Sequence, residues 1–416
     1  MRFAEFLFAP RAVALMLVLA PAWSLAHAAA PELEAEPAAA AAPKAWQWAG
    51  IYKADALHAN TGSLNSWVGN LNLRADADAG QLFGWAGTSF HIEALLNHGG
   101  KPNQLIGSTQ GISNIEVAEG AARLYATWLE HEFAESGTRV LFGLYDLNSE
   151  FYSTEASALL INPSFGIGVD ASQSGRNGPS VFPNLGLTLR LRQALGASHY
   201  VQAALIDGVP GDPAHPGRTV VKLSREDGAL GVLEFGYQER GEDGGNGPGH
   251  WALGAWQYSA QSPSRAHGSA GTARNHGIYA LAQGLLHQGQ GSTRTIGFVR
   301  SGLAHSKVNA VDCALDTGLL IEHPLASVSG LANLAPQTFT AGLAYAHYGQ
   351  GWRDAQLAAG TPISSHELVL EIGARWQPLP TLAVQPLLQH LWHPGGRREA
   401  SSTLIGARLE WSFGAP

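Results

Sequence analysis

The sequence predicts an all-β fold, a transmembrane antiparallel β-barrel of about 16 strands with a long loop folded into its lumen. Three observations support this prediction: apolar and polar residues alternate with period two, charged residues are scarce, and the apolar faces end in aromatic residues. Charged residues make up 14% of the 416 residues, whereas about 25% is usual in a globular protein. Glycine, with 50 residues, and tryptophan, with 12, are abundant instead.

The first 28 residues have the features of a secretory signal peptide. Arg2 and Arg11 are followed by an apolar run over 12–22, and Ala26-His27-Ala28 fits a small-x-small cleavage site. The apolar run is shorter than the about 20 residues that a membrane-spanning helix needs. Residues 29–45 are mostly Ala, Pro and Glu without periodicity, so we expect an Ala/Pro-rich periplasmic linker there and the barrel over 46–416.

Alternating stretches recur through the rest of the chain. In 185–192 leucines alternate with Gly, Thr and Arg, and 366–377 and 405–413 follow the same scheme. Weaker examples lie at 140–144, 201–205, 233–237 and 339–345. Strands of this kind suit either a soluble sandwich, which turns its apolar face inward, or a membrane barrel, which turns that face to lipid.

The barrel is favoured because the apolar faces carry interfacial aromatic residues, namely Trp376, Trp392, Trp411 and Phe413. The single cysteine, Cys313, excludes an internal disulfide and any zinc site that needs two cysteines. No segment after the leader offers 18 uninterrupted apolar residues, which argues against membrane-spanning helices. At roughly 24 residues for a strand and its connection, the chain accommodates about 16 strands, enough to enclose an aqueous channel.

Turn-forming residues predict connections of unequal length. Short ones lie at 135–137 and 195–197, and long ones at 207–218, 240–249 and 261–276. Barrels of this type have short periplasmic turns and long extracellular loops, so we expect the two sets at opposite ends.

The longest connection, 148–183, lacks sustained alternation and is rich in polar and aromatic residues. A loop of this length inside a compact domain is usually functional, and a wide barrel can take it up in the lumen, where it narrows the channel. Aromatic faces would then contact sugar rings, while amides and charged groups would bind ring hydroxyls. We expect the constriction to include Asn148, Glu150, Phe151, Arg176 and Asn177; the alternative is a loop that only plugs or stiffens the barrel.

Several segments resemble, in order, the carbohydrate-selective porins of the OprB family. They are GWAGTSFHIEALLNHGG (84–100), ISNIEVAEGAARLYATWLEHEF (112–133), GLYDLNSEFYSTEASALLINPSFGIGVDASQSGRNGPSVFP (143–183), DGVPGDPAHPG (207–217) and HELVLEIGARWQPLPTLAVQPLLQHLWHPGG (366–396). The resemblance implies a 16-stranded barrel in the bacterial outer membrane through which sugars diffuse without energy input.

Relatives in this family often carry an arginine in the narrow part of the channel, near the end of the segment 90–100. This sequence has Asn97 and His98 there, and we count both as candidates for the constriction. We expect Arg176, or Arg123 on an adjacent strand, to supply the missing cation. Glu367, Glu371, Arg375 and Arg408 lie on polar faces of strands and are expected to line the lumen wall.

The expected partners are permeating sugars, outer-membrane lipid and the barrel assembly machinery, which would engage the last strand ending at Phe413. A homotrimer and a monomer both remain open. The net charge of −8 argues against a nucleic-acid partner. Motifs for a nucleophile elbow, a phosphate-binding loop or a zinc protease are lacking in the sequence, so neither an enzyme, a cofactor nor a metal is expected. The alternatives are a general or ion-selective porin and a secreted β-rich sugar-binding protein or enzyme.

Overall fold

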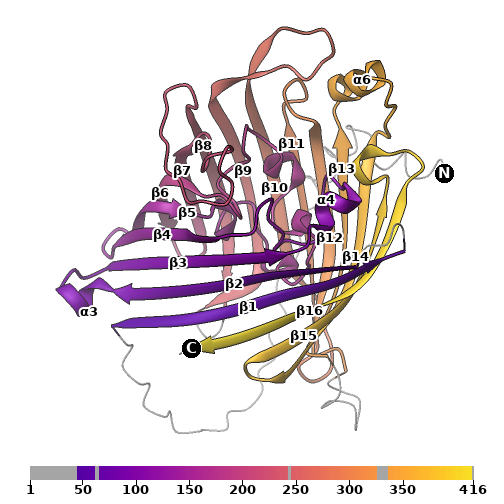
Figure 1. Cartoon of the computed structure of the whole chain (residues 1–416). Helices are drawn as coiled ribbons and strands as arrows, with labels where there is room; N and C mark the ends of the chain where they lie inside the picture. Colours follow the sequence, from indigo (N-terminus) through magenta and orange to yellow (C-terminus); the bar gives the residue numbers. More distant parts are fainter. Residues whose placement is uncertain (1–44, 61–64, 242–244, 326–335, 415–416) are drawn as a thin grey trace. The chain divides into compact units, whose positions relative to one another are not determined.

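The protein is represented by a computed structural model that describes residues 45–60, 65–241, 245–325 and 336–414. In this part of the chain sixteen antiparallel strands form one closed barrel, in which each strand pairs with its sequence neighbours and β1 pairs with β16 (Figure 1). The predicted barrel of about 16 strands is therefore confirmed. The expected signal peptide (1–28) and nearly all of the expected linker (29–45) lie outside the described residues and stay predictions.

The strands and helices have the following bounds. The strands are β1 (Trp46–Ala59), β2 (Asn65–Asp78), β3 (Thr88–Gly99), β4 (Ala122–Phe133), β5 (Thr138–Tyr145), β6 (Gly186–Leu195), β7 (His199–Asp207), β8 (Ala229–Arg240), β9 (Asn246–Pro263), β10 (Thr272–Gln288), β11 (Arg294–Ala304), β12 (Val311–Glu322), β13 (Thr338–Tyr348), β14 (His366–Leu379), β15 (Leu382–Trp392) and β16 (Ser401–Gly414). The helices are α3 (Ala79–Phe83), α4 (Pro102–Ile106), α5 (Val169–Ser172) and α6 (Gln350–Ala358), with 3₁₀ turns η1 (Leu147–Ser149), η2 (Glu155–Ser157), η3 (Pro163–Phe165) and η4 (Pro394–Gly396). None of the described helices has the length and apolar character needed to cross a membrane.

Alternation along each strand separates an outer apolar face from an inner polar face. On β6, Leu189 is 49% exposed and Leu191 is 47% exposed, whereas Arg190 between them is 1% exposed. Because successive side chains of a strand point to opposite faces, this contrast fixes the outward and inward directions. The faces of 185–192, 366–377 and 405–413 follow the sequence prediction.

Aromatic side chains occupy the outer face near both ends of the barrel. Trp48 near the start of β1 and Trp411 near the end of β16 lie at one end, while Trp67 on β2 and Trp392 on β15 lie at the other. Tryptophan prefers the boundary between the apolar and polar zones of a bilayer. The two belts therefore bracket an apolar band, as in a membrane barrel.

The two ends of the barrel differ in their connections. The end at which β1 begins and β16 ends, called the turn end, carries 134–137 and 196–198, and the loop end carries the two longest connections, 100–121 and 146–185. The expectation of a long loop at 240–249 is wrong, because β9 begins at Asn246 and this connection lies at the turn end. The glycines there serve packing: a Cβ at Gly247 would lie 2.8 Å from Cγ of Glu239. The expected loop 261–276 is likewise shortened by β9 and β10 to 264–271.

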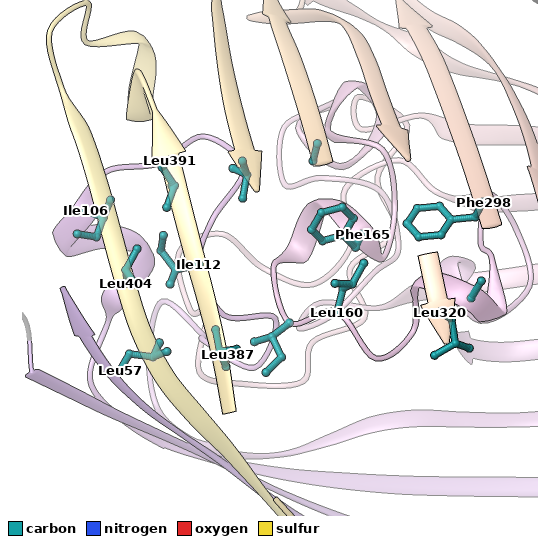
Figure 2. Close-up of a cluster of buried hydrophobic side chains, with 14 of the residues drawn as sticks. Leu57, Ile106, Ile112, Leu160, Phe165, Phe298, Leu320, Leu387, Leu391 and Leu404 are labelled. Atoms are coloured by element: carbon teal, nitrogen blue, oxygen red, sulfur yellow. The ribbon is translucent and has the colours of Figure 1, made fainter. Parts of the chain in front are cut away.

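An apolar core joins the two long connections to the inner face of the barrel. Figure 2 shows Ile106 and Ile112 of segment 100–121 beside Leu391 and Leu404 of the wall. In the same cluster Leu160 and Phe165 of segment 146–185 pack with Phe298 and Leu320 of β11 and β12. Burying these side chains gives each segment a fixed position.

Candidate functional site

Inner-face polar side chains fall into two groups. Those on β8 and β10–β16 that touch the segments 100–121 and 146–185 are buried and hold these segments to the wall. Those on β2–β6 form a second group, which we call the β2–β6 strip and define as Asn70, Asn72, His91, Glu93, Asn97, Arg123, Tyr125, Trp128, Glu130 and Arg190.

Glu367 on β14 anchors segment 100–121. Its carboxylate accepts hydrogen bonds from the backbone N–H groups of Thr109 and Gln110, both at 3.0 Å, and from that of Gly395 at 2.6 Å. A buried carboxylate needs several donors to offset its lost hydration. Glu367 therefore fixes the segment, together with the connection between β15 and β16, and does not line an open wall.

Glu371, two residues farther along β14, anchors the segment 146–185. Its carboxylate accepts hydrogen bonds from the backbone N–H groups of Ile161 at 2.6 Å and Asn162 at 2.7 Å. Nε2 of Gln389 on β15 donates a third, at 3.0 Å. Glu371 is 0% exposed, so this predicted lumen-wall residue is covered by the segment that it holds.

Arg300 on β11 is an anchor that the sequence analysis missed. Its guanidinium donates to the backbone carbonyls of Ser164 at 2.5 Å and Gly166 at 2.6 Å, and it pairs with Asp316 on β12 at 3.0 Å. Arginine suits this place because its planar fork offers five donors. The stretch 294–304 carries two arginines, Arg294 and Arg300, and only the path of the segment 146–185 shows what Arg300 binds.

Glu234 on β8 completes the set of anchors. It accepts hydrogen bonds from the backbone N–H of Tyr152 at 3.0 Å, from the hydroxyl of Tyr279 at 2.7 Å and from the hydroxyl of Tyr200 at 2.9 Å. The rings of Tyr152 and Tyr279 stack with centroids 4.1 Å apart. Hydrogen bonds to Glu234 and ring stacking on Tyr279 thus both hold Tyr152 of the segment 146–185 against the wall.

Arg408 and Arg375 were both predicted to line the lumen wall, but they differ in burial and in whether they bind a long segment. Arg408 on β16 makes two hydrogen bonds to Asp55 on β1, at 2.7 and 2.8 Å, and also binds Asn114 at 2.7 Å. This bidentate pair is buried and joins segment 100–121 to the seam between β1 and β16. Arg375 instead pairs with Glu410 at 3.0 Å with both side chains partly exposed, and it contacts neither long segment in the described residues.

The strip begins with a chain of amides on β2 and β3. Nδ2 of Asn97 donates to Oδ1 of Asn70 at 2.6 Å, Asn70 donates to Asn72, and Asn72 donates to the carboxylate of Glu93. Asn97 therefore lies on the inner face, as expected. The chain ends at Glu93, where partly exposed acceptor oxygens remain for a solute.

Arg190 on β6 stands between two carboxylates. Its Nε lies 2.9 Å from Oε2 of Glu150, and it also forms an ion pair with Glu130 on β4. The hydroxyl of Tyr145 donates to Glu150 at 2.6 Å. Glu150 thus joins the strip from segment 146–185, and its place in a constriction stays a prediction.

Trp128 on β4 brings an aromatic face to the strip. Its ring stacks on that of His91 on β3, with centroids 4.8 Å apart and planes inclined by 13°. The register of β3 and β4 shifts between Ile92 and Ala94, which marks a β-bulge beside Glu93. Without that extra residue, strict alternation from Arg123 would have turned Trp128 outward, which is why the sequence did not reveal it.

Two predicted constriction residues do not face the lumen. His98 lies on the outer face, where its ring is stacked 5.9 Å from that of Tyr52 and its Nε2 is 3.1 Å from the Tyr52 hydroxyl. The expectation for His98 was wrong because neighbours on a strand point to opposite faces, and Asn97 takes the inner one. Phe151 is 0% exposed within the apolar core around Leu147, and no solute can reach it in this arrangement.

The remaining predicted residues hold the long segment together. Nδ2 of Asn148 donates to the carbonyl of Gly166 at 2.9 Å, and Nδ2 of Asn177 donates to the carbonyl of Pro210 at 2.7 Å. Arg123 binds Asn184 and the carbonyl of Glu119 from the strip. Arg176 is exposed and pairs with Asp227 at 2.9 Å near the loop end.

Chemically, the strip combines amides, carboxylates, a guanidinium group and an indole face along one wall. Hydroxyl groups of a sugar can donate to Glu93 and Glu130 and accept from Asn72. The apolar face of a sugar ring can lie on Trp128. Such a wall suits weak, sequential binding of a neutral polyhydroxylated solute.

Burial raises the pKa of Glu116, in segment 100–121, to about 7. Hydrogen bonds from the backbone N–H groups of Asn103 and Gln104, and the charge of Lys101, act in the opposite direction. The carboxyl group of Glu116 caps the first turn of α4 through these two hydrogen bonds.

Comparison with known proteins agrees with this fold. The family profile described as carbohydrate-selective porin, OprB family, matches residues 66–413. No curated protein matches the chain. The high-pH structure of OprB from Pseudomonas putida superposes with a TM-score of 0.74 at 17% identity, covering 88% of this chain and 93% of that one. The low-pH structure of the same protein gives a TM-score of 0.55 at 13% identity, with coverages of 89% and 93%. The outer-membrane channel DcaP of Acinetobacter baumannii gives 0.51 at 11% identity, with coverages of 88% and 97%.

Proposed function

The chain belongs to the carbohydrate-selective porin family, OprB, and on this premise we propose that sugars cross the barrel along the β2–β6 strip. The protein is a passive, carbohydrate-selective channel of the bacterial outer membrane. The proposal concerns the route and the partly exposed residues that line it: Asn72, Glu93, Trp128, Glu130 and Glu150.

One observation supports this route above the others, namely the contrast between the two walls. Glu367, Glu371 and Arg300 are buried beneath the segments that they anchor, and Arg123, Tyr125 and Arg190 of the strip are buried too. Glu93, Trp128 and Glu130 of the strip, by contrast, remain partly exposed. The anchored segments would therefore occupy one side of the lumen and leave the strip to the solute. In this proposal the segment 146–185 narrows the channel and does not close it.

Liposome swelling tests the function. Reconstituted protein should admit mono- and disaccharides faster than amino acids of equal size, and Trp128→Ala should reduce that preference. Trp67→Ala, on the outer face, is the matched control. Equal swelling rates for both solute classes would contradict sugar selectivity.

A general or ion-selective porin is the second candidate. The charged group of Arg190, Glu130 and Glu150 favours it, since fixed charges at a narrow point discriminate ions. Single-channel recording separates the two functions: a sugar-selective channel shows current block by maltose, and a general porin conducts without it.

Export, assembly and oligomeric state also belong to the proposal. We propose cleavage of the leader 1–28, delivery to the barrel assembly machinery through β16, whose last aromatic residue is Phe413 beside the terminal Gly414, and a channel without a catalytic step. Intact mass of the mature protein tests the cleavage site, and light scattering in detergent distinguishes a homotrimer from a monomer.

A further inference from the structure

A pocket of about 490 Å³ opens at the loop end and is separate from the β2–β6 strip. Its walls come from the end of segment 146–185, both ends of 208–228, the facing ends of β9 and β10, and the connections 264–271 and 305–310. A volume of this size lies in the range of small-ligand sites, about 300–1,000 Å³.

The pocket has a built polar lining. Asp227 forms an ion pair with Arg176, with 2.9 Å between the two charged groups. The Asp227 side chain is only 8% exposed, whereas that of Arg176 is 63% exposed. Asn275 is buried and exchanges two hydrogen bonds with Asn309, at 2.9 and 2.8 Å. A buried carboxylate that is paired with an exposed arginine can accept a hydrogen bond from a ligand hydroxyl and keep the arginine as its counter-charge.

Apolar surface completes the lining. Tyr258 is buried beside Gly175, where a Cβ would lie 2.6 Å from the tyrosine hydroxyl, so a glycine lets the segment close the pocket floor. Val209, Pro263 and Val308 add aliphatic contacts. Polar groups next to small apolar patches match the alternating hydroxyl and C–H surface of a sugar ring.

Charge identifies the class of ligand. Two arginines, Arg176 and Arg265, face two acidic residues, Glu226 and Asp227, so the formal charge of the lining is zero. A site for an anionic sugar would carry a surplus of basic groups. We propose that this pocket is an outer docking site that binds a neutral mono- or disaccharide before it passes to the strip.

The inference rests on the proposed function for its ligand class, and a binding measurement keeps the two separable. Saturation-transfer NMR of the detergent-solubilised protein, with maltose, glucose and glucuronate as probes, reports binding without transport. Asp227→Ala and Arg176→Ala should each weaken maltose binding by roughly tenfold or more, the effect of one lost hydrogen bond to a charged group. Arg294→Ala, which breaks the ion pair with Glu322 near the turn end, should leave it unchanged. Asp227→Asn, which keeps the shape of the side chain, should fall between wild type and Asp227→Ala.

Each combination of binding and swelling results either supports or refutes the docking site. Unchanged maltose binding in both Asp227→Ala and Arg176→Ala overturns the docking site, even if liposome swelling is sugar-selective. Reduced binding in these variants together with unselective swelling retains the docking site and refutes the proposed selectivity. Stronger binding of glucuronate than of glucose, lost in Arg176→Ala, would overturn the assignment to neutral sugars.

Discussion

The carboxylate of Glu371 on β14 accepts a hydrogen bond of 2.7 Å from the backbone N–H of Asn162, which lies 209 residues earlier in the chain. The adjacent N–H of Ile161 binds the other carboxylate oxygen at 2.6 Å. One side chain of the wall thereby holds two consecutive peptide groups of the segment 146–185. In the proposed function the width of the channel depends on such contacts, because the strands alone would enclose a wider lumen.

Glu371→Gln should loosen this segment. Replacing the charged acceptor removes hydrogen bonds of the stronger, charge-assisted kind and lowers the free energy that holds the segment by about 2 kcal/mol. We expect larger open-channel current noise and weaker sugar block in planar bilayers, with the barrel intact in a heat-modifiability assay. Glu410→Gln is the matched control, because Glu410 pairs with Arg375 and with neither long segment in the described residues. Identical noise in the two variants would show that Glu371 does not restrain the channel.

Alternation in the sequence predicted which strand residues face inward, including Glu371 and Arg408, because period two follows directly from strand geometry. It did not predict which inward residues stay open to solute. That difference depends on the route of 100–121 and 146–185, and neither segment has a periodicity that fixes a route. Residues of the long segment were therefore the least predictable: Glu150 reaches the strip, while Phe151 beside it is buried.

Trp128→Ala should weaken sugar binding in the channel. Loss of the indole face removes a contact worth about 0.5–1.5 kcal/mol, which corresponds to a roughly 2- to 12-fold weaker binding constant for maltose block. Titration of single-channel current with maltose measures it. Trp67→Ala removes an indole from the outer face and should leave the block unchanged. Equal effects of the two substitutions would place the sugar path elsewhere.

The β-bulge beside Glu93 shows where alternation misleads. One extra residue in β4 brings four side chains to the same face, namely those of Arg123, Tyr125, Trp128 and Glu130. Strict alternation would require steps of two residues, but the step from Tyr125 to Trp128 is three residues. A bulge has no dependable sequence signal, so the residue with the largest apolar surface in the strip could not be assigned from the sequence.

Arg190→Gln should shift the channel toward cations. The substitution leaves Glu150 without its arginine and Glu130 with only the more distant Arg139, at 3.7 Å, so the negative charge of this part of the lumen increases. The reversal potential across a KCl gradient measures the shift, which should be larger near 0.1 M salt, where the screening length is about 10 Å, than near 1 M, where it is about 3 Å. Arg190→Lys keeps the charge and should restore most of the wild-type value. A reversal potential that is the same in wild type and Arg190→Gln would remove Arg190 from the ion path.

Segment 100–121 should loosen as the pH rises, because of Glu116. Burial raises the pKa of Glu116 to about 7, above the unfolded value of 4.5, so the folded segment binds the proton more tightly than the unfolded one. The stabilising contribution of the protonated acid is therefore complete below pH 4.5 and is lost as the pH rises through about 7. Hydrogen exchange at the amides of Asn103 and Gln104, corrected for intrinsic rates, should show more protection at pH 5 than at pH 8. Glu116→Gln should abolish this dependence, while Glu119→Gln in the same segment should retain it; protection that increases with pH in wild type would refute the role of Glu116.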